Sequence, residues 1–383
     1  MSDNTDVHFA GMGHFGVQSI YEDKISGRWG ANYKASQSGL LIVFLIILFL
    51  SGCSPKQQAV DLYVDAVMLR ELNENEMAVD KLNKAIELNE RFLLAHSLLG
   101  EVYQEQGDYE RSAASYERAT ELNQWSFKDY FNLGRVYQVM KKFAQAVRAY
   151  VRACEIKPEH LEAHLNAAES FYELKEYDRA LAYGERAQQI DPNVSKVQKI
   201  LGDVYESQKD YEQAICSYKR ALEIDSNDTE VMVSLAVAYL RTNRNEPAKE
   251  LLRSVVETEP ENNGAYQYLG YCYLRFYEQA VRAYKRESKK GDSDAEVLNS
   301  LTKEAGQAVE KALESYNKAI AINDKDWESY RGIGVANMIR ALNEGNDMLK
   351  SKAVYQWRLS LKINPEQPRR EQLDRLIEKY SRK

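Results

Sequence analysis

Small and bulky apolar residues recur along this chain at a constant interval of 34 positions. A bulky residue follows each small one three positions later. The small series is Ala66, Gly100, Gly134, Ala168, Gly202, Ala236 and Gly270, and the bulky series is Leu69, Tyr103, Tyr137, Phe171, Tyr205, Tyr239 and Tyr273. Two further small series begin at Ala78 and Ala85. The pattern predicts two antiparallel helices per unit, which cross where Gly or Ala lets their backbones approach.

Turn signals fall where the predicted helices should stop. Gly107-Asp108 interrupts the second unit, and prolines end the third, fourth and sixth units at Pro158, Pro192 and Pro260. The units run over 59–92, 93–126, 127–160, 161–194, 195–228 and 229–262. Together these units, 59–262, are predicted to form six regular helix pairs.

The second and third units share residues at equivalent places. These are Leu99, Gly100, Tyr103, Gly107, Asp108, Tyr109, Tyr116 and Ala119, then Leu133, Gly134, Tyr137, Phe143, Ala146, Tyr150, Ala153 and Pro158. The set resembles the tetratricopeptide repeat (TPR), although the family's first-helix Trp is replaced by His96, Tyr130, His164 and Tyr266. The resemblance covers about four fifths of the chain. It implies an all-α, right-handed α-solenoid (superhelix) of helix-turn-helix repeats that binds proteins in a concave groove lined by the first helix of each pair.

The interval fails after Tyr273. The pattern resumes at Tyr277, four positions later instead of six, and a second shortened unit follows from Ala295. Loss of a turn should fuse the two helices of a unit, so 263–324 is predicted to contain two irregular units fused into a long helical hairpin. The predicted helices run from about Ala265 to Lys289 and from about Asp294 to Asn323, around a turn at 290–293, and each is on the order of 40 Å long. The alternative is two ordinary units with a kink near Phe276.

A last unit is predicted over 325–365. It begins near Trp327, places Gly334 at the small position, and contains a loop over 343–347. The charged segment 366–383 carries apolar residues on one helical face, namely Leu373, Leu376, Ile377 and Tyr380. It is predicted to be a capping helix that covers the last repeat.

The front of the chain has a different composition. Leu40 to Leu50 is an apolar run of eleven residues, too short to span a bilayer but suited to the core of a signal peptide. Leu50-Ser51-Gly52-Cys53 follows and resembles the lipobox of bacterial lipoproteins. The resemblance implies cleavage of a leader and signal peptide over 1–52, lipid on Cys53, and a linker over 53–58. The alternative is a free Cys after a short membrane helix.

The segment before this run is unlike the usual start of a signal peptide. It is about forty residues long, acidic at its beginning and thinly basic. We therefore expect the true start codon to lie downstream of Met1. Gly11 to Gly16 matches the glycine pattern of dinucleotide-binding proteins, but no strand precedes it and no amphipathic helix follows, so no nucleotide site is expected there.

Composition and charge exclude several classes of function. A net charge of -7 and a pI near 5.6 argue against nucleic-acid binding. Apart from Cys53, the cysteines lie in three different units, which does not suggest a local disulfide framework. Cys154 and Cys272 are predicted to be core residues, and Cys216 is predicted to face outward.

Catalytic, cofactor and metal sites are not expected. His160, Glu162 and His164 have a spacing that could hold a metal, but their order differs from that of zinc proteases, and His164 occupies a buried first-helix position. No Ser, Cys or carboxylate has a convincing base partner. The many Glu and Lys residues are typical of solvated helix faces.

The partner groove is predicted from the register of the first helices. Its charged part comprises Glu101, Arg135, Glu169, Lys199 and Asp203, and its apolar part comprises Val233, Val237, Leu240, Tyr271, Leu274, Val335, Met338 and Ile339. An exposed apolar stretch would dock a partner helix or peptide, unless the hairpin folds back and buries it. Some relatives hold a peptide carboxylate with a Lys and Asn clamp, which has no counterpart among the charged positions here.

These features predict a non-catalytic, membrane-anchored scaffold that faces the periplasm of a bacterium and helps to assemble a pilus, a secretion pore or outer-membrane proteins. The partners would be a protein or peptide in the groove and the membrane through lipid on Cys53. Ser54 after the lipidated Cys, in place of Asp, favours the outer membrane. The alternatives are a subunit that recruits a cell-envelope enzyme such as a cell-wall hydrolase, and a cytoplasmic protein whose apolar run is only an anchor.

Overall fold

The computed structural model of the chain describes residues 54–290 and 294–381. These residues form helices joined by short turns, and no strand occurs among them. The helices are α2 (Pro55–Glu71), α3 (Asn75–Leu88), α4 (Leu93–Glu105), α5 (Tyr109–Leu122), α6 (Phe127–Val139), α7 (Phe143–Ile156), α8 (Leu161–Glu173), α9 (Tyr177–Ile190), α10 (Ser195–Ser207), α11 (Tyr211–Ile224), α12 (Thr229–Arg241), α13 (Asn245–Thr258), α14 (Asn263–Glu287), α15 (Ala295–Ile322), α16 (Trp327–Glu344), α17 (Asp347–Ile363) and α18 (Arg370–Ser381).

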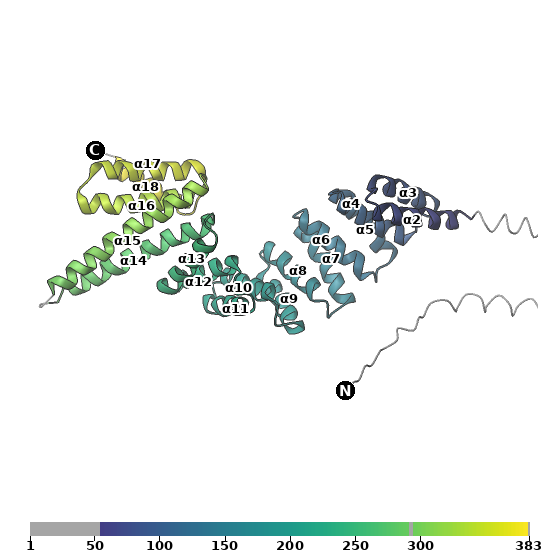
Figure 1. Ribbon diagram of the computed structural model, residues 1–383, viewed down its shortest axis with the longest axis horizontal. Helices are drawn as coiled ribbons and strands as arrows, with labels where there is room; N and C mark the ends of the chain where they lie inside the picture. Colours follow the sequence, from purple (N-terminus) through teal and green to yellow (C-terminus); the bar gives the residue numbers. More distant parts are fainter. Residues whose placement is uncertain (1–53, 291–293, 382–383) are drawn as a thin grey trace, which may run out of the picture.

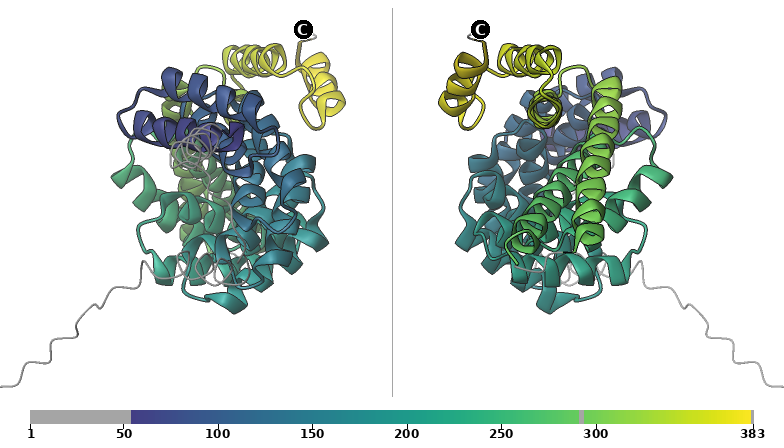
Figure 2. Two further views of the ribbon diagram at one scale, coloured as in Figure 1. Left: turned by 90° about the vertical axis from the view of Figure 1, so that its right-hand side faces the viewer. Right: turned by 90° about the vertical axis from the view of Figure 1, so that its left-hand side faces the viewer.

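The helices pack as consecutive antiparallel pairs that stack side by side along the molecule (Figure 1). Viewed end-on, the pairs wind around one axis (Figure 2). Each helix contacts the one before it and the one after it, so the core is continuous along the array and is buried between neighbours. The predicted all-α, right-handed solenoid is confirmed.

The turn inside each regular unit is built in one way. A residue in the left-handed backbone conformation recurs every 34 positions, with φ between 56° and 76°. These residues are Asn73, Gly107, Lys141, Lys175, Lys209 and Asn243. The amide of the next residue donates to a carbonyl five positions back, as from Asp108 N to Tyr103 O at 2.9 Å, which is the bond of a Schellman motif. The same turn geometry therefore recurs at each interval.

Where the two helices of a unit cross, the size of the residue on the second helix depends on the size of the residue on the first. Where the first helix has Gly, the residue sixteen positions later is Tyr: a Cβ built on Gly134 would lie 2.6 Å from the Tyr150 ring. Where the first helix has Ala, the later residue is smaller. The pairs with Ala are Ala66 with Leu82, Ala168 with Gly184, and Ala236 with Leu252. A ring therefore fills the space that only Gly leaves open.

The predicted long helical hairpin is confirmed. Its helices are α14 with 25 residues and α15 with 28, close to the predicted spans. Tyr277 stands where the next left-handed residue would be, and the chain continues there as helix. A bulky aromatic residue adopts the left-handed conformation poorly, so the turn cannot form at this place. The hairpin projects away from the neighbouring helices (Figure 1). Most of the predicted turn, 291–293, lies outside the described residues.

The hairpin is one unit with a long insertion, and the prediction of two fused units was wrong. Gly270 of α14 receives the ring of Tyr316, 46 positions later, whereas regular partners are sixteen apart. Thirty residues are therefore inserted into the turn of a seventh unit. With those residues left out, Tyr316 falls on the register of Leu252. The small and aromatic residues near Ala280, which suggested another unit, belong instead to the inserted part of the hairpin, where Ala280 is buried.

The last pair differs from the prediction in its turn. Only Gly345 and Asn346 separate α16 from α17, because both helices extend into the predicted loop. Gly345 adopts the left-handed conformation, with φ of 65°. The predicted capping helix is confirmed as α18. Its packing residues are Leu373, Leu376, Ile377 and Tyr380, in the same core cluster as Trp357.

The first described helix has a face that no described residue covers. Met68 of α2 is 60% exposed, whereas its equivalents Val102, Val136 and Val204 are at most 1% exposed. In those later units the second helix of the preceding unit covers this position. The N-terminal end of the described array therefore lacks the cover that α18 provides at the other end.

The described helices show no membrane span. None of those within 54–290 and 294–381 is both long and apolar enough to cross a bilayer. Cys53, the apolar run and the leader lie outside the described residues, so the predicted lipid anchor is not tested by the fold.

Candidate partner-binding groove

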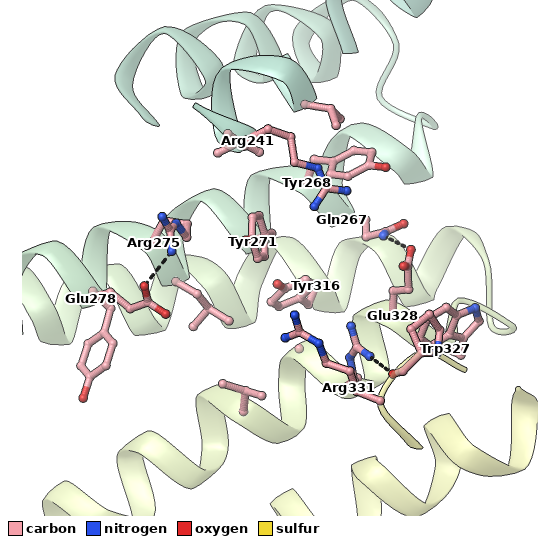
Figure 3. A pocket seen from close by; sticks show the side chains of 18 of the residues that line it. Arg241, Gln267, Tyr268, Tyr271, Arg275, Glu278, Tyr316, Trp327, Glu328 and Arg331 are labelled. Atoms are coloured by element: carbon pink, nitrogen blue, oxygen red, sulfur yellow. Dashed lines mark hydrogen bonds and ion pairs between the residues drawn. The ribbon is translucent and has the colours of Figure 1, made fainter. Parts of the chain in front are cut away.

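A cavity of about 610 Å³ opens on the concave side of the C-terminal half of the array. Its walls come from α12, α14, α15, α16 and the segment before α18 (Figure 3). Six of the eight apolar groove residues expected from the sequence line it. They are Val237, Leu240, Tyr271, Leu274, Val335 and Ile339. The register of the repeats therefore located the residues of one site across three helices.

Two of the expected apolar residues do not line the cavity. Val233 is half-buried against the core between α12 and its neighbours. Met338 is 6% exposed and packs in the C-terminal core with Trp357. On α16, Val335 and Ile339 line the cavity and lie one turn apart, so the adjacent Met338 points in another direction. The expectation that Met338 faces the groove was wrong.

The apolar wall is only partly accessible. Val237 and Leu240 of α12 are 9% and 5% exposed, so much of their surface is buried. Tyr271 and Val335 are 43% and 37% exposed. A partner would therefore meet the accessible rings and methyl groups of α14 and α16, with the α12 residues beneath them.

Arginine residues that the sequence analysis did not select also line the cavity. Arg241 and Arg275 are 34 positions apart, at a groove-facing place where Glu71, Glu105 and Glu173 stand in earlier units. That change of sign at a constant register position was the signal available in the sequence. The other two are Arg331 and Arg369. The sequence offered no such signal for these two, because Arg331 follows the insertion and Arg369 follows the last unit.

The four guanidinium groups have different surroundings. Arg275 pairs with Glu278 at 2.9 Å and also donates to Asn243. Arg331 lies over the Trp327 ring, 5.2 Å from its centroid, and donates to the Pro368 carbonyl at 3.2 Å. Within the described part of the chain, Arg275 alone of the four has a carboxylate within 4.0 Å.

Carboxylates are fewer than guanidinium groups on the cavity wall. Glu278 is engaged by Arg275, and Glu328 accepts a hydrogen bond from Gln267. Burial raises the pKa of Tyr268, and the nearby Glu328 raises it further, so its phenol stays neutral. The cavity therefore carries surplus positive charge, although the whole chain is acidic.

The charged half of the predicted groove is largely paired within the protein. Glu101 binds Arg70 at 2.8 Å and Lys128 at 2.5 Å, so it links three successive units. Glu169 binds Lys196 at 2.9 Å. Arg135 has no carboxylate within 4.0 Å among the described residues. The first helices of neighbouring units are thus joined by ion pairs across the concave surface.

A second charged cluster lies one unit further along. Lys199 contacts Asp203 and Glu230, each at 3.0 Å, and the Tyr218 hydroxyl donates to Asp203 at 2.8 Å. Burial lowers the pKa of Lys199, but Asp203 and Glu230 outweigh it and the pKa is raised. Burial likewise raises the pKa of the Glu206 carboxyl. The charges of this cluster are therefore largely paired within the protein.

His160 and His164 both interact with nearby backbone groups. His160 caps α8 by accepting from the Ala163 amide at 3.2 Å, and His164 is buried with its ring 2.9 Å from the Pro158 carbonyl. The described residues contain no cluster of three metal-ligating side chains.

As predicted, Cys154 and Cys272 are buried and Cys216 is exposed. Burial raises the pKa of both buried thiols to about 12.

Comparison with known proteins defines the class to which this architecture belongs. The chain is a TPR protein: residues 70–301 match the family model of the TPR domain described as the cilia and flagella-associated protein 70 C-terminal domain. Because the match covers more than half of the chain, the protein belongs to this family. No curated protein matches the chain.

Solved structures of other repeat proteins are similar to parts of the chain. YrrB, described as a TPR protein with an unusual peptide-binding site, is 21% identical over 48% of this chain and 95% of its own, with a TM-score of 0.43. MamA 41-end from Desulfovibrio magneticus RS-1 is 16% identical over 44% of this chain and 96% of its own, with a TM-score of 0.43. Another MamA structure is 17% identical over 44% and 92%, with a TM-score of 0.42.

Proposed function

We propose that the protein is a non-catalytic scaffold that holds a protein partner in the C-terminal cavity. The observation that carries this proposal is the cavity itself. It combines accessible apolar side chains with three guanidinium groups, those of Arg241, Arg331 and Arg369, that have no carboxylate within 4.0 Å among the described residues. Its volume lies in the range of sites that hold ligands. Membership in a TPR family supports a role in protein binding.

We further propose that the scaffold is anchored by lipid on Cys53 and assists assembly of a periplasmic or outer-membrane complex. The sequence before α2 supports this proposal, since the lipobox-like residues end at Cys53 and α2 begins at Pro55, capped by the Ser54 hydroxyl. A lipid on Cys53 would hold the first unit beside the membrane. The cavity lies towards the other end of the array (Figure 1).

Labelling with palmitate tests the anchor. Cells that express the full chain should incorporate labelled palmitate into it, and Cys53→Ala should abolish the incorporation and leave the leader attached. Equal labelling of Cys53→Ala would contradict the anchor and leave the partner-binding proposal untouched.

Crosslinking in intact membranes, followed by mass spectrometry, tests the cavity. Tyr271→Glu with Val335→Glu places two carboxylates on the accessible apolar wall, so the main crosslinked partners should be lost. Ile224→Glu is the control, because this residue is 40% exposed and lies outside the cavity. If both variants crosslink the same partners as the unmodified protein, the cavity is not the binding site. The identity of the partner separates an assembly component from a cell-wall enzyme.

A further inference from the structure

We infer that the partner segment is acidic: an extended peptide in which carboxylate side chains alternate with apolar ones. This inference rests on the proposed protein binding in the C-terminal cavity and names the chemistry of what binds there. It is carried by the arrangement of the four arginines around an apolar floor.

The arginines approach the cavity from separate elements. Arg241 ends α12, Arg275 lies in α14, Arg331 lies in α16, and Arg369 precedes α18. Arg241 and Arg331 point into the cavity from opposite walls (Figure 3). Charges spread around an opening in this way would contact several groups along an extended ligand, and not one group alone.

The available positive charge remains after the internal pairs are subtracted. Glu278 and Glu328 are the carboxylates on the cavity wall, and Glu278 neutralises Arg275. Glu328 contacts Gln267 and has no cation within 4.0 Å among the described residues. Arg241, Arg331 and Arg369 therefore face one free carboxylate on the wall, and the complementary ligand is negative.

One of these groups is already oriented for binding. The Trp327 ring and the Pro368 carbonyl hold the Arg331 guanidinium, which reduces the side-chain entropy lost when a ligand binds. A guanidinium group can donate two parallel hydrogen bonds to one carboxylate. A carboxylate of the ligand at Arg331 would therefore contribute more to affinity than the same negative charge spread over the ligand.

The floor of the cavity requires apolar groups in the same ligand. The exposed parts of Tyr271 and Val335 line the same cavity as the arginines, and they would remain in contact with water beneath a purely charged chain. In an extended peptide successive side chains point to opposite sides, so acidic and apolar residues in alternation can meet both features.

Binding of a labelled peptide to the full chain tests this inference. The probe is an eight-residue peptide that alternates Glu with Leu, and its matched controls carry Gln or Lys in place of Glu. Fluorescence anisotropy should show that the Gln peptide binds at least about tenfold more weakly than the Glu peptide, and the Lys peptide more weakly still. Equal binding of the Glu and Gln peptides, or no binding of the Glu peptide, would overturn the acidic preference.

Arginine variants locate the effect. Arg241→Gln with Arg369→Gln removes two exposed charges, so folding should be retained, as circular dichroism can verify, and affinity for the Glu peptide should fall about tenfold. Arg220→Gln with Arg253→Gln makes the same change of net charge at exposed sites outside the cavity and should leave the affinity unchanged. An equal loss in both double variants would overturn the assignment to the cavity.

The two proposals fail in different ways. If Tyr271→Glu with Val335→Glu abolishes crosslinking while the Glu and Gln peptides bind equally, the scaffold function stands and the acidic preference is wrong. If crosslinking is also unaffected by that variant, partner binding in the cavity is wrong as well.

Discussion

At the scale of single residues, the solenoid depends on matched sizes where the two helices of a unit cross. Gly is paired with Tyr and Ala with a smaller residue, so the interval of 34 positions carries a second, coupled pattern. The coupling has a simple cause. The ring of Tyr150 occupies the volume that a Cβ on Gly134 would need, and a tightly packed core cannot absorb the overlap without strain.

Gly134→Ala should therefore destabilise the protein by about 1–3 kcal/mol, as overpacking does in other cores. Adding Tyr150→Leu recreates the pairing of Ala236 with Leu252, so the double variant should lose less than the sum of the two single losses. Midpoints of urea unfolding provide the measurement. Gly306→Ala is the control: no atom lies within 4 Å of its added Cβ, and it should stabilise α15 by about 0.5–1 kcal/mol. Strict additivity of the two single losses would contradict the coupling.

Residues of the site were predicted most reliably where they kept the regular register. Tyr271 was found because it stands 34 positions after Val237, and both line the cavity. After the inserted hairpin, Val335 and Ile339 were predicted correctly, but Met338 was not, because α16 is longer than the regular first helices and the register separates its groove side from its core side less sharply. The charges were missed for a different reason: Arg241, Arg275, Arg331 and Arg369 come from separate elements, and only the tertiary packing brings them to one cavity.

At the scale of elements, the loss of one turn produces the hairpin. The sequence predicted two long helices because the spacing from Tyr273 to Tyr277 is four where the repeat requires six. The structure adds that Tyr277 stands where the other turns have a left-handed residue. The sequence did not indicate that Gly270 and Tyr316 belong to the same unit, because the inserted residues repeat the small and aromatic residues of a unit. The contact of Gly270 with Tyr316 decides that question, because it has the geometry of the regular crossings.

Deletion of 277–306, combined with Gln307→Gly and Ala308→Asp, should convert the seventh unit into a regular one. Gly270 and Tyr316 become sixteen positions apart, and the new Gly-Asp pair stands where Gly107-Asp108 stands in the second unit. Few of the described residues of the inserted segment are buried, so the apparent Tm should change by less than about 5 °C. Calorimetry and circular dichroism provide the measurements. Loss of the cooperative transition would show that the inserted residues are required for the fold.

At the scale of the whole molecule, stability is expected to vary along the array. Each unit is held by its neighbours, and the last pair is also covered by α18. The first helix α2 has a neighbour on one side only among the described residues, and Met68 is exposed on the other side. The two ends of the described array are therefore unequal.

Hydrogen exchange should detect this difference. Amides of α2 and α3 should exchange at least about tenfold faster than those of α10 and α11, which are packed on both sides, because local opening requires less free energy where fewer contacts are broken. Mass spectrometry of peptides from the intact chain gives the rates. Uniform protection from α2 to α13 would mean that another segment or molecule covers the α2 face.

The inserted hairpin leaves the turn of the seventh unit and returns to it, so its length is independent of the winding of the solenoid. Removing seven residues from each of its helices shortens it by about 10 Å, and because seven residues make nearly two helical turns the apolar faces keep their direction. The length of the hairpin can therefore vary while its attachment to the array stays the same. Evolution can change how far the protein extends without altering the angle between the sixth unit and the last.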